Sequence, residues 1–182
     1  MSRNSFENAK RRLNGLPGAL QRACFAAMGR TLSHSKTVLS REIRSEYSIK
    51  AKTARRAISA KRVKGSGSTS AEIRVRGPNL FASEFAMRPR TDTTGAKRRE
   101  VRLGIRKTGL KSDDRGFVRK GLLLQRKTSS SYPLEPVFGP SVAGMAANDE
   151  VVKTLESAVA ETFERRLDHE VKRLLSKGTK SK

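Results

Sequence analysis

The sequence predicts an α+β fold in which a long N-terminal and a long C-terminal amphipathic helix pack on a small, mainly antiparallel β-sheet. Two observations predict the helices: apolar residues recur every four positions near both ends of the chain. A third predicts the sheet, because apolar and charged residues alternate in short runs between those ends. At 182 residues the chain has the length of one domain, and we expect a single domain over residues 1–182.

The first helical part is expected over residues 17–58. Pro17 suits the first turn of a helix, whereas Gly29 and the polar patch at 33–35 are candidate interruptions. A shorter basic helix or turn is expected at 49–58. The apolar stripe that predicts the long helix consists of Leu20, Cys24, Met28, Leu32, Leu39, Ile43 and Tyr47.

Strands and loops are expected over residues 71–126. Residues 71–76 and 101–106 alternate apolar and charged side chains, as half-buried strands do, and a third strand-like run covers 117–124. Between them, residues 88–96 form an open region. Residues 108–116 are rich in glycine and charge, so we expect a mobile loop there.

A proline-rich segment, residues 132–142, precedes the last helix, and we call it the proline ribbon. Pro133, Pro136 and Pro140 fix φ and remove backbone donors, so the ribbon is neither a helix nor a central strand. Its other side chains include Leu134, Val137, Phe138 and Val142, which is not the composition of a flexible linker. Two interpretations stay open: the ribbon lies across its own core, or it docks on a neighbouring subunit.

The C-terminal helix is expected over residues 149–177, with Asn148 or Asp149 as its cap. Its stripe is the most regular pattern in the chain, and it favours a face that packs on the core. The stripe consists of Val151, Leu155, Val159, Phe163, Leu167, Val171 and Leu175.

The formal charge of +23 is concentrated before the last helix. Residues 148–182 carry a net charge of +1, which leaves +22 on residues 1–147. So much localised charge favours a polyanion or an acidic partner nearby. The single cysteine, Cys24, excludes an internal disulfide. We find no run long enough for a membrane span and no hydrophobic signal region, so we expect synthesis and assembly in a cytoplasm and no membrane partner.

The motifs of common enzyme and metal sites are missing. The sequence has no phosphate-binding loop with its lysine, no cysteine or histidine pair at metal spacing and no glycine-flanked nucleophilic serine. We therefore expect no enzyme, no cofactor and no metal. A small nuclease is a remote alternative, for which Asp113, Asp114 and His34 are the candidate residues.

Several basic residues belong to the predicted strands. Because Arg74, Arg76, Arg102 and Arg106 alternate with apolar residues, we expect them on the sheet face opposite the core. With Lys97, Arg98 and Arg99 they would face DNA phosphates or an acidic partner. No aromatic residues are interleaved with them, so base stacking and sequence readout are not expected. The alternative is a solvated sheet face.

The order of these elements resembles the prophage minor tail protein Z family. The most recognisable piece is residues 134–142, with Gly139-Pro140-Ser141 at its centre, between strands and a last helix. Residues 23–58 are also similar, with Arg41-Glu42 followed by Ile49-Lys50-Ala51-Lys52.

The resemblance implies a structural virion protein of a long-tailed bacteriophage or prophage that completes the tail at its head-proximal end. It implies a ring around the DNA passage, six copies by analogy with tail symmetry, and neighbours such as the tail terminator and tail tube. It suggests no catalytic residues. The proline ribbon would then form the subunit interface, through Tyr132, Pro133, Leu134, Pro136, Val137, Phe138, Gly139, Pro140 and Val142.

A second function class stays open at this point: a basic RNA- or DNA-binding protein of ribosomal or nucleoid type. That alternative predicts nucleic-acid binding by the isolated monomer with a steep dependence on salt.

Overall fold

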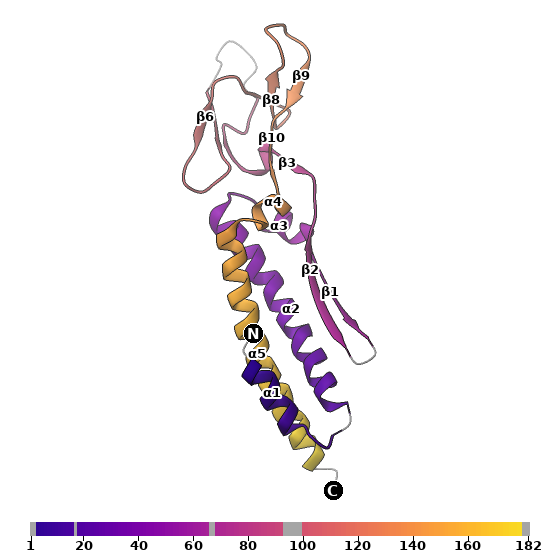
Figure 1. The fold of residues 1–182 in the computed structure, drawn as a ribbon. Coiled ribbons are helices and arrows are strands. Elements are labelled where there is room, and N and C mark those ends of the chain that lie inside the picture. The colour runs from indigo at the N-terminus through magenta and orange to yellow at the C-terminus, as the bar shows by residue number, and fades with distance from the viewer. Residues whose placement is uncertain (1–2, 17, 66–67, 93–99, 180–182) are drawn as a thin grey trace. The chain divides into compact units, whose positions relative to one another are not determined.

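A computed structural model describes residues 3–16, 18–65, 68–92 and 100–179 (Figure 1). The chain divides into two compact units. The first, which we call the helical unit, comprises Met1–Leu39, Ile58–Arg74 and Asp149–Lys182. The second, the strand unit, comprises Ser40–Ala57 and Val75–Asn148. Helices and small antiparallel sheets together confirm the predicted α+β class.

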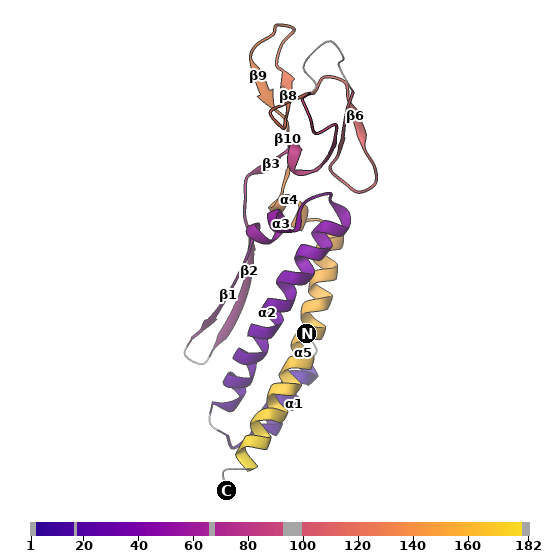
Figure 2. The same cartoon turned by 180° about the vertical axis from the view of Figure 1, so that it is seen from behind.

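Three helices and one hairpin make up the helical unit. These elements are α1 (Arg3–Arg12), the greater part of α2 (Ala19–Glu46), α5 (Asp149–Thr179) and the pair β1 (Ile58–Lys64) and β2 (Thr69–Val75). Helix α1 lies along the C-terminal half of α5, and Figure 2 shows the β1–β2 hairpin beside α2. The bounds of α2 and α5 confirm the two long helices expected from the apolar spacing.

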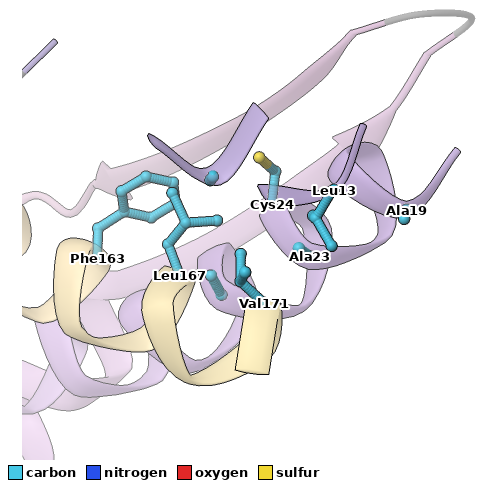
Figure 3. Close-up of a cluster of buried hydrophobic side chains, with 9 residues drawn as sticks. Leu13, Ala19, Ala23, Cys24, Phe163, Leu167 and Val171 are labelled. Atoms are coloured by element: carbon cyan, nitrogen blue, oxygen red, sulfur yellow. The ribbon is translucent and has the colours of Figure 1, made fainter. Parts of the chain in front are cut away.

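The core of the helical unit is built largely from small residues of α2 facing larger ones of α5 (Figure 3). Alanines on α2 allow the helices to approach closely, while Phe163, Leu167 and Val171 of α5 fill the space between them. Cys24 is 8% exposed within this cluster, and burial raises the pKa of its thiol. The cluster consists of Ala9, Leu13, Ala19, Ala23, Cys24, Ala27, Phe163, Leu167 and Val171.

Helix α2 continues through both of the interruptions considered from the sequence. The Thr31 hydroxyl donates to the carbonyl of Ala27 at 3.0 Å, and the Ser35 hydroxyl donates to that of Thr31 at 2.8 Å. Both hydroxyls are therefore satisfied within the helix although both residues are buried. Gly29 is also part of the helix.

Helix α1 was not predicted, because the sequence there presents a charged lead with few apolar residues. It is anchored by Ala9 and by Leu13 just beyond its end, both in the core of the helical unit. Its last residue, Arg12, pairs with Asp168 of α5 at 2.8 Å. Asp168 also pairs with Lys172 at 2.7 Å, and the hydrogen bonds from Lys172 and then Arg12 lower the pKa of its carboxyl.

The strand unit contains short strands in three antiparallel sheets. One sheet has the order β4–β5–β6, a second β7–β8–β9, and a third pairs β10 with β3. Short helices α3 (Ala51–Ala57) and α4 (Val142–Ala146) and the 3₁₀ turn Ala82–Glu84 accompany them. The strands are β3 (Asn79–Phe81), β4 (Ala86–Arg88), β5 (Val101–Gly104), β6 (Lys111–Asp113), β7 (Phe117–Arg119), β8 (Leu122–Arg126), β9 (Leu134–Pro136) and β10 (Phe138–Ser141).

Two expectations for this region need correction. Residues 108–116, expected as a mobile loop, contain β6, which pairs with β5 through Val101–Asp113 and Leu103–Lys111. The run 117–124, expected as one strand, is a hairpin. Lys120 and Gly121 have φ of 50° and 74°, the positive values of a tight two-residue turn, which a glycine adopts without strain.

The core of the strand unit collects residues from several sheets. Ala82, Met87, Val101, Val118 and Leu123 form one buried cluster, against which the partly buried Leu103 and Val137 pack. Phe85, Val142 and Met145 are also fully or almost fully buried. Side chains from the proline ribbon therefore contribute to this core.

Candidate subunit and DNA interfaces

The proline ribbon is fixed to its own unit along part of its length. The Val137 N–H donates to the Leu123 carbonyl at 2.9 Å, and the Ala82 N–H donates to the Val137 carbonyl at 2.8 Å. Strand β9 is the edge strand beside β8, and β10 belongs to a two-stranded sheet. The ribbon is thus neither helix nor central strand over residues 132–141, as its prolines predict, and it covers its own core at Val137.

Gly139 marks the closest approach of the ribbon to this core. It is buried, and a methyl group placed on it would lie 2.5 Å from Phe85 Cε2 and 3.0 Å from Phe85 Cζ. Phe85 itself has no exposed surface. The position therefore requires a glycine because of the Phe85 ring beside it and not because of its backbone angles. Val142, three residues later, is also buried.

The opposite side of the ribbon carries exposed aromatic rings. Phe138 is 50% exposed and stacks on Phe81 of β3, which is 42% exposed, with ring centroids 5.0 Å apart and an angle of 27° between the planes. Tyr132, at the start of the ribbon, is 69% exposed. We call Phe81 and Phe138 the aromatic edge. Of the remaining predicted interface residues, Pro133 is exposed and the others are half-buried: Leu134, Pro136 and Pro140.

Two residues of this region were missed from the sequence. Phe81 is not a candidate from the sequence, because nothing there indicates that it pairs with Phe138, 57 positions later. Ser141 was read as part of the ribbon, but its hydroxyl accepts a hydrogen bond from the Gly144 N–H at 3.1 Å and caps α4. The signal available in the sequence was the preference of serine for the N-cap position of a helix.

The strand arginines do not share one sheet face. Arg74 lies in β2 and Arg102 in β5, and these strands belong to different sheets. Each is paired with a glutamate two residues earlier on the chain. Arg74 pairs with Glu72, which raises the pKa of the guanidinium, and Arg102 pairs with Glu100 at 3.3 Å. These pairs reduce the positive charge that the two arginines offer to a partner.

The other predicted basic residues differ in their surroundings. Arg106 lies over the Tyr47 ring at 5.7 Å from its centroid, next to a β-bridge between the same two residues. Arg76 is exposed just beyond β2. Lys97, Arg98 and Arg99 lie outside the described residues.

The carboxylates considered for a nuclease have structural partners. Asp113 Oδ1 accepts from the Gly116 N–H at 3.0 Å and from the Gln125 side chain at 3.1 Å, so it orders the turn before β7. Asp114 accepts from the Ser112 hydroxyl at 2.8 Å. His34 is an exposed residue of α2, in the other unit. Within the described ranges, no group of three or more His, Cys, Asp or Glu residues could hold a metal ion.

No helix within the described residues is both long enough and apolar enough to span a membrane.

Comparison with known proteins identifies the family. The family model of the prophage minor tail protein Z (GPZ) matches residues 4–180, which is nearly the whole chain. No curated protein and no solved structure matches the sequence. The match covers both long helices, the strands and the proline ribbon on which the resemblance was noted.

Proposed function

The chain belongs to the prophage minor tail protein Z family and is a structural protein of a phage tail, and from this premise we propose that it completes the tail at its head-proximal end. In this proposal several copies form a ring around the DNA passage, six by analogy with tail symmetry. The flanking components are other tail and neck proteins, such as the tail terminator and the tail tube.

The observation that carries the ring is the aromatic edge. Phe138 of the ribbon and Phe81 of β3 are stacked and about half exposed, and prolines and core contacts hold the ribbon in place. Rigid aromatic side chains lose little conformational entropy on binding, and aromatic residues are enriched in subunit interfaces. Solvent-exposed rings on a fixed edge are therefore a suitable contact for the next subunit.

A ring requires that the aromatic edge meets a different surface of the neighbour, because head-to-tail contacts are the ones that close into rings. The proline ribbon would supply one side of each contact, through those predicted residues that are exposed or half-buried and do not serve its own core: Tyr132, Pro133, Leu134, Pro136, Phe138 and Pro140. The strand arginines and Lys97 to Arg99 would face DNA or an acidic neighbour.

The first test is the mass of the purified protein by light scattering, at low and high salt and with nucleic acid removed. We expect a ring of several subunits for the wild type. Replacing both Phe81 and Phe138 by serine should give monomers. Val63 is a matched control, because it is 47% exposed on the β1 strand of the helical unit, whereas the ribbon belongs to the strand unit. Val63→Ser should leave the ring intact.

An intact ring in the Phe81→Ser/Phe138→Ser variant would refute the assignment of the interface. The position in the tail needs a separate measurement, because a ring could sit at either end. Gold-labelled antibody against this protein should mark one end of purified tails, the end that joins the head. Labelling at the distal end, or along the tube, would refute the head-proximal position.

A further inference from the structure

The helical unit contains a basic groove, and none of the strand arginines is among its described lining residues. It has a volume of about 900 Å³ and lies between α2, strand β1 and α5. Five of its lining residues are lysine or arginine, and we call them the groove cations. They are Arg30 and Lys36 from α2, Arg62 from β1, and Arg166 and Arg173 from α5.

Arg62 is held in the groove by three contacts. Its guanidinium lies 4.1 Å from the centroid of the Phe25 ring and donates to the Phe25 carbonyl at 2.9 Å. The third contact is with Gly29, where an added methyl group would lie 2.8 Å from Arg62 Cζ and closer still to one of its nitrogens. A glycine in the middle of a helix costs about 1 kcal/mol relative to alanine. Here the glycine leaves room for the arginine.

Most of the groove's positive charge is not neutralised by the residues that the structure describes. Glu170 is the one carboxylate among the described residues that line the groove, and it is paired with Arg173 at 2.6 Å. Arg30, Lys36 and Arg166 make no ion pair with any described residue. Several cations are thus brought to one concave surface, which is the arrangement that attracts a polyanion.

The lining distinguishes among the polyanions. The centres of protein–protein interfaces are depleted of charge, whereas half of the described residues that line this groove are charged, and Leu32 is the one large apolar residue among them. Among the described residues that line it there is no Phe, Tyr or Trp, so it offers no platform for the unstacked bases of a single strand. The phosphates of a duplex need neither an apolar surface nor an aromatic platform.

We propose that the groove cations bind the phosphate backbone of double-stranded DNA without sequence preference. This inference rests on the proposed function for the source of the DNA, which is the molecule that passes through the tail. One groove contacts few phosphates and binds weakly, but several copies on one duplex bind much more strongly than one. The groove thus gives a ring a means of holding DNA that does not depend on its sequence.

The test uses the full-length protein, freed of nucleic acid, and a fluorescent duplex of arbitrary sequence in a titration by anisotropy. The groove variant changes the three cations that make no ion pair with a described residue: Arg30→Gln, Lys36→Gln and Arg166→Gln. The control variant removes the same charge from exposed positions of the same two helices outside the groove: Arg22→Gln, Lys153→Gln and Arg165→Gln.

Each phosphate contact contributes about 0.9 to the slope of log affinity against log salt. Loss of three contacts should therefore lower the slope by about 2 to 3 and weaken binding by about a hundredfold near 0.1 M salt. The loss of duplex affinity in the control variant should be less than about a tenth of the loss in the groove variant. Equal losses in the two variants, or none in the groove variant, would overturn the proposal.

A second probe, polyglutamate, separates DNA from an acidic protein as the occupant. Tight polyglutamate binding that the groove variant abolishes, without comparable duplex binding, would overturn the DNA assignment. Circular dichroism and urea unfolding of both variants establish that they fold. Light scattering on the same samples keeps this test apart from that of the ring, because groove-dependent binding by a monomer would refute the ring and leave the groove assigned.

Discussion

The substitution Gly139→Ala tests how the proline ribbon is fixed to the strand unit. The added methyl carbon would lie 2.5, 3.0 and 3.3 Å from three carbons of the Phe85 ring, whereas carbon atoms in contact prefer about 3.5–4.0 Å. The ring is fully buried, so it cannot turn into solvent. Overpacking of this kind destabilises a protein by about 1–3 kcal/mol, and we expect a loss of about 2 kcal/mol in the free energy of unfolding.

The assay is urea unfolding of the single variants Gly139→Ala and Phe85→Leu and of the double variant. Phe85→Leu alone should cost roughly 1–2 kcal/mol, because it leaves a cavity. In the double variant the new methyl group occupies part of that cavity, so its loss should be smaller than the two losses together by about 1 kcal/mol or more.

Gly144→Ala is the matched control. Gly144 is an exposed residue of α4 at which an added methyl group would meet no neighbour closer than 3.5 Å. Alanine is the better helix former, so this variant should be neutral or up to about 1 kcal/mol more stable. A Gly139→Ala variant within about 0.5 kcal/mol of the wild type, together with additive losses in the cycle, would refute the close contact with Phe85.

Two further predictions concern the helical unit. Gly29→Ala should displace Arg62 from the groove and weaken duplex binding by up to about tenfold, which is the share of one phosphate contact. The free energy of unfolding should change little, because the gain in helix propensity offsets the lost contacts of the Arg62 guanidinium. Unchanged duplex binding would refute the role of Gly29. Asp168→Asn should reduce the free energy of unfolding near neutral pH. Because Lys172 and Arg12 lower the pKa of Asp168 in the folded chain, the difference between variant and wild type should disappear as pH falls below the ordinary value of 3.8. A difference in stability that is independent of pH across that range would contradict this prediction.

The two long helices could be predicted from the sequence because each buries one continuous stripe. Stripes at four-residue spacing placed α2 and α5 within a few residues of their observed ends. Helix α1 could not be found in this way, because Ala9 and the adjoining Leu13 are its only buried residues among those whose burial is described, and Phe6 is exposed. Its stability comes from packing and from the Arg12 ion pair, which are properties of the folded chain.

Strands β2 and β5 could be predicted because apolar and charged residues alternate along them. Alternation identifies which residues of a strand face the same side, and it placed Arg74 and Arg102 on polar faces. It does not say which strands pair, so the expectation of one common face could not be tested from the sequence. Strands β3, β9 and β10 are three or four residues long, and their pairing is set by contacts distant in sequence, such as that of Phe81 with Phe138.

The basic groove was beyond prediction for a similar reason. Arg30 and Arg166 are separated by more than a hundred positions, and only the packing of α2 against α5 brings them to one surface. One local signal was present. Gly29 interrupts an otherwise regular helical pattern, and a glycine retained in a helix indicates a close neighbour, which proves to be Arg62.

The two proposed surfaces differ in chemistry, and salt therefore separates them. The aromatic edge buries apolar rings, an interaction that added salt does not screen. The groove cations release counterions from DNA, so their binding falls steeply as salt rises. A ring that persists at high salt while duplex binding is lost would show that apolar contacts hold the subunits together and that charged contacts hold the DNA. If the ring itself dissociated at high salt, charged contacts would hold the subunits together, and the aromatic edge could not be their principal interface.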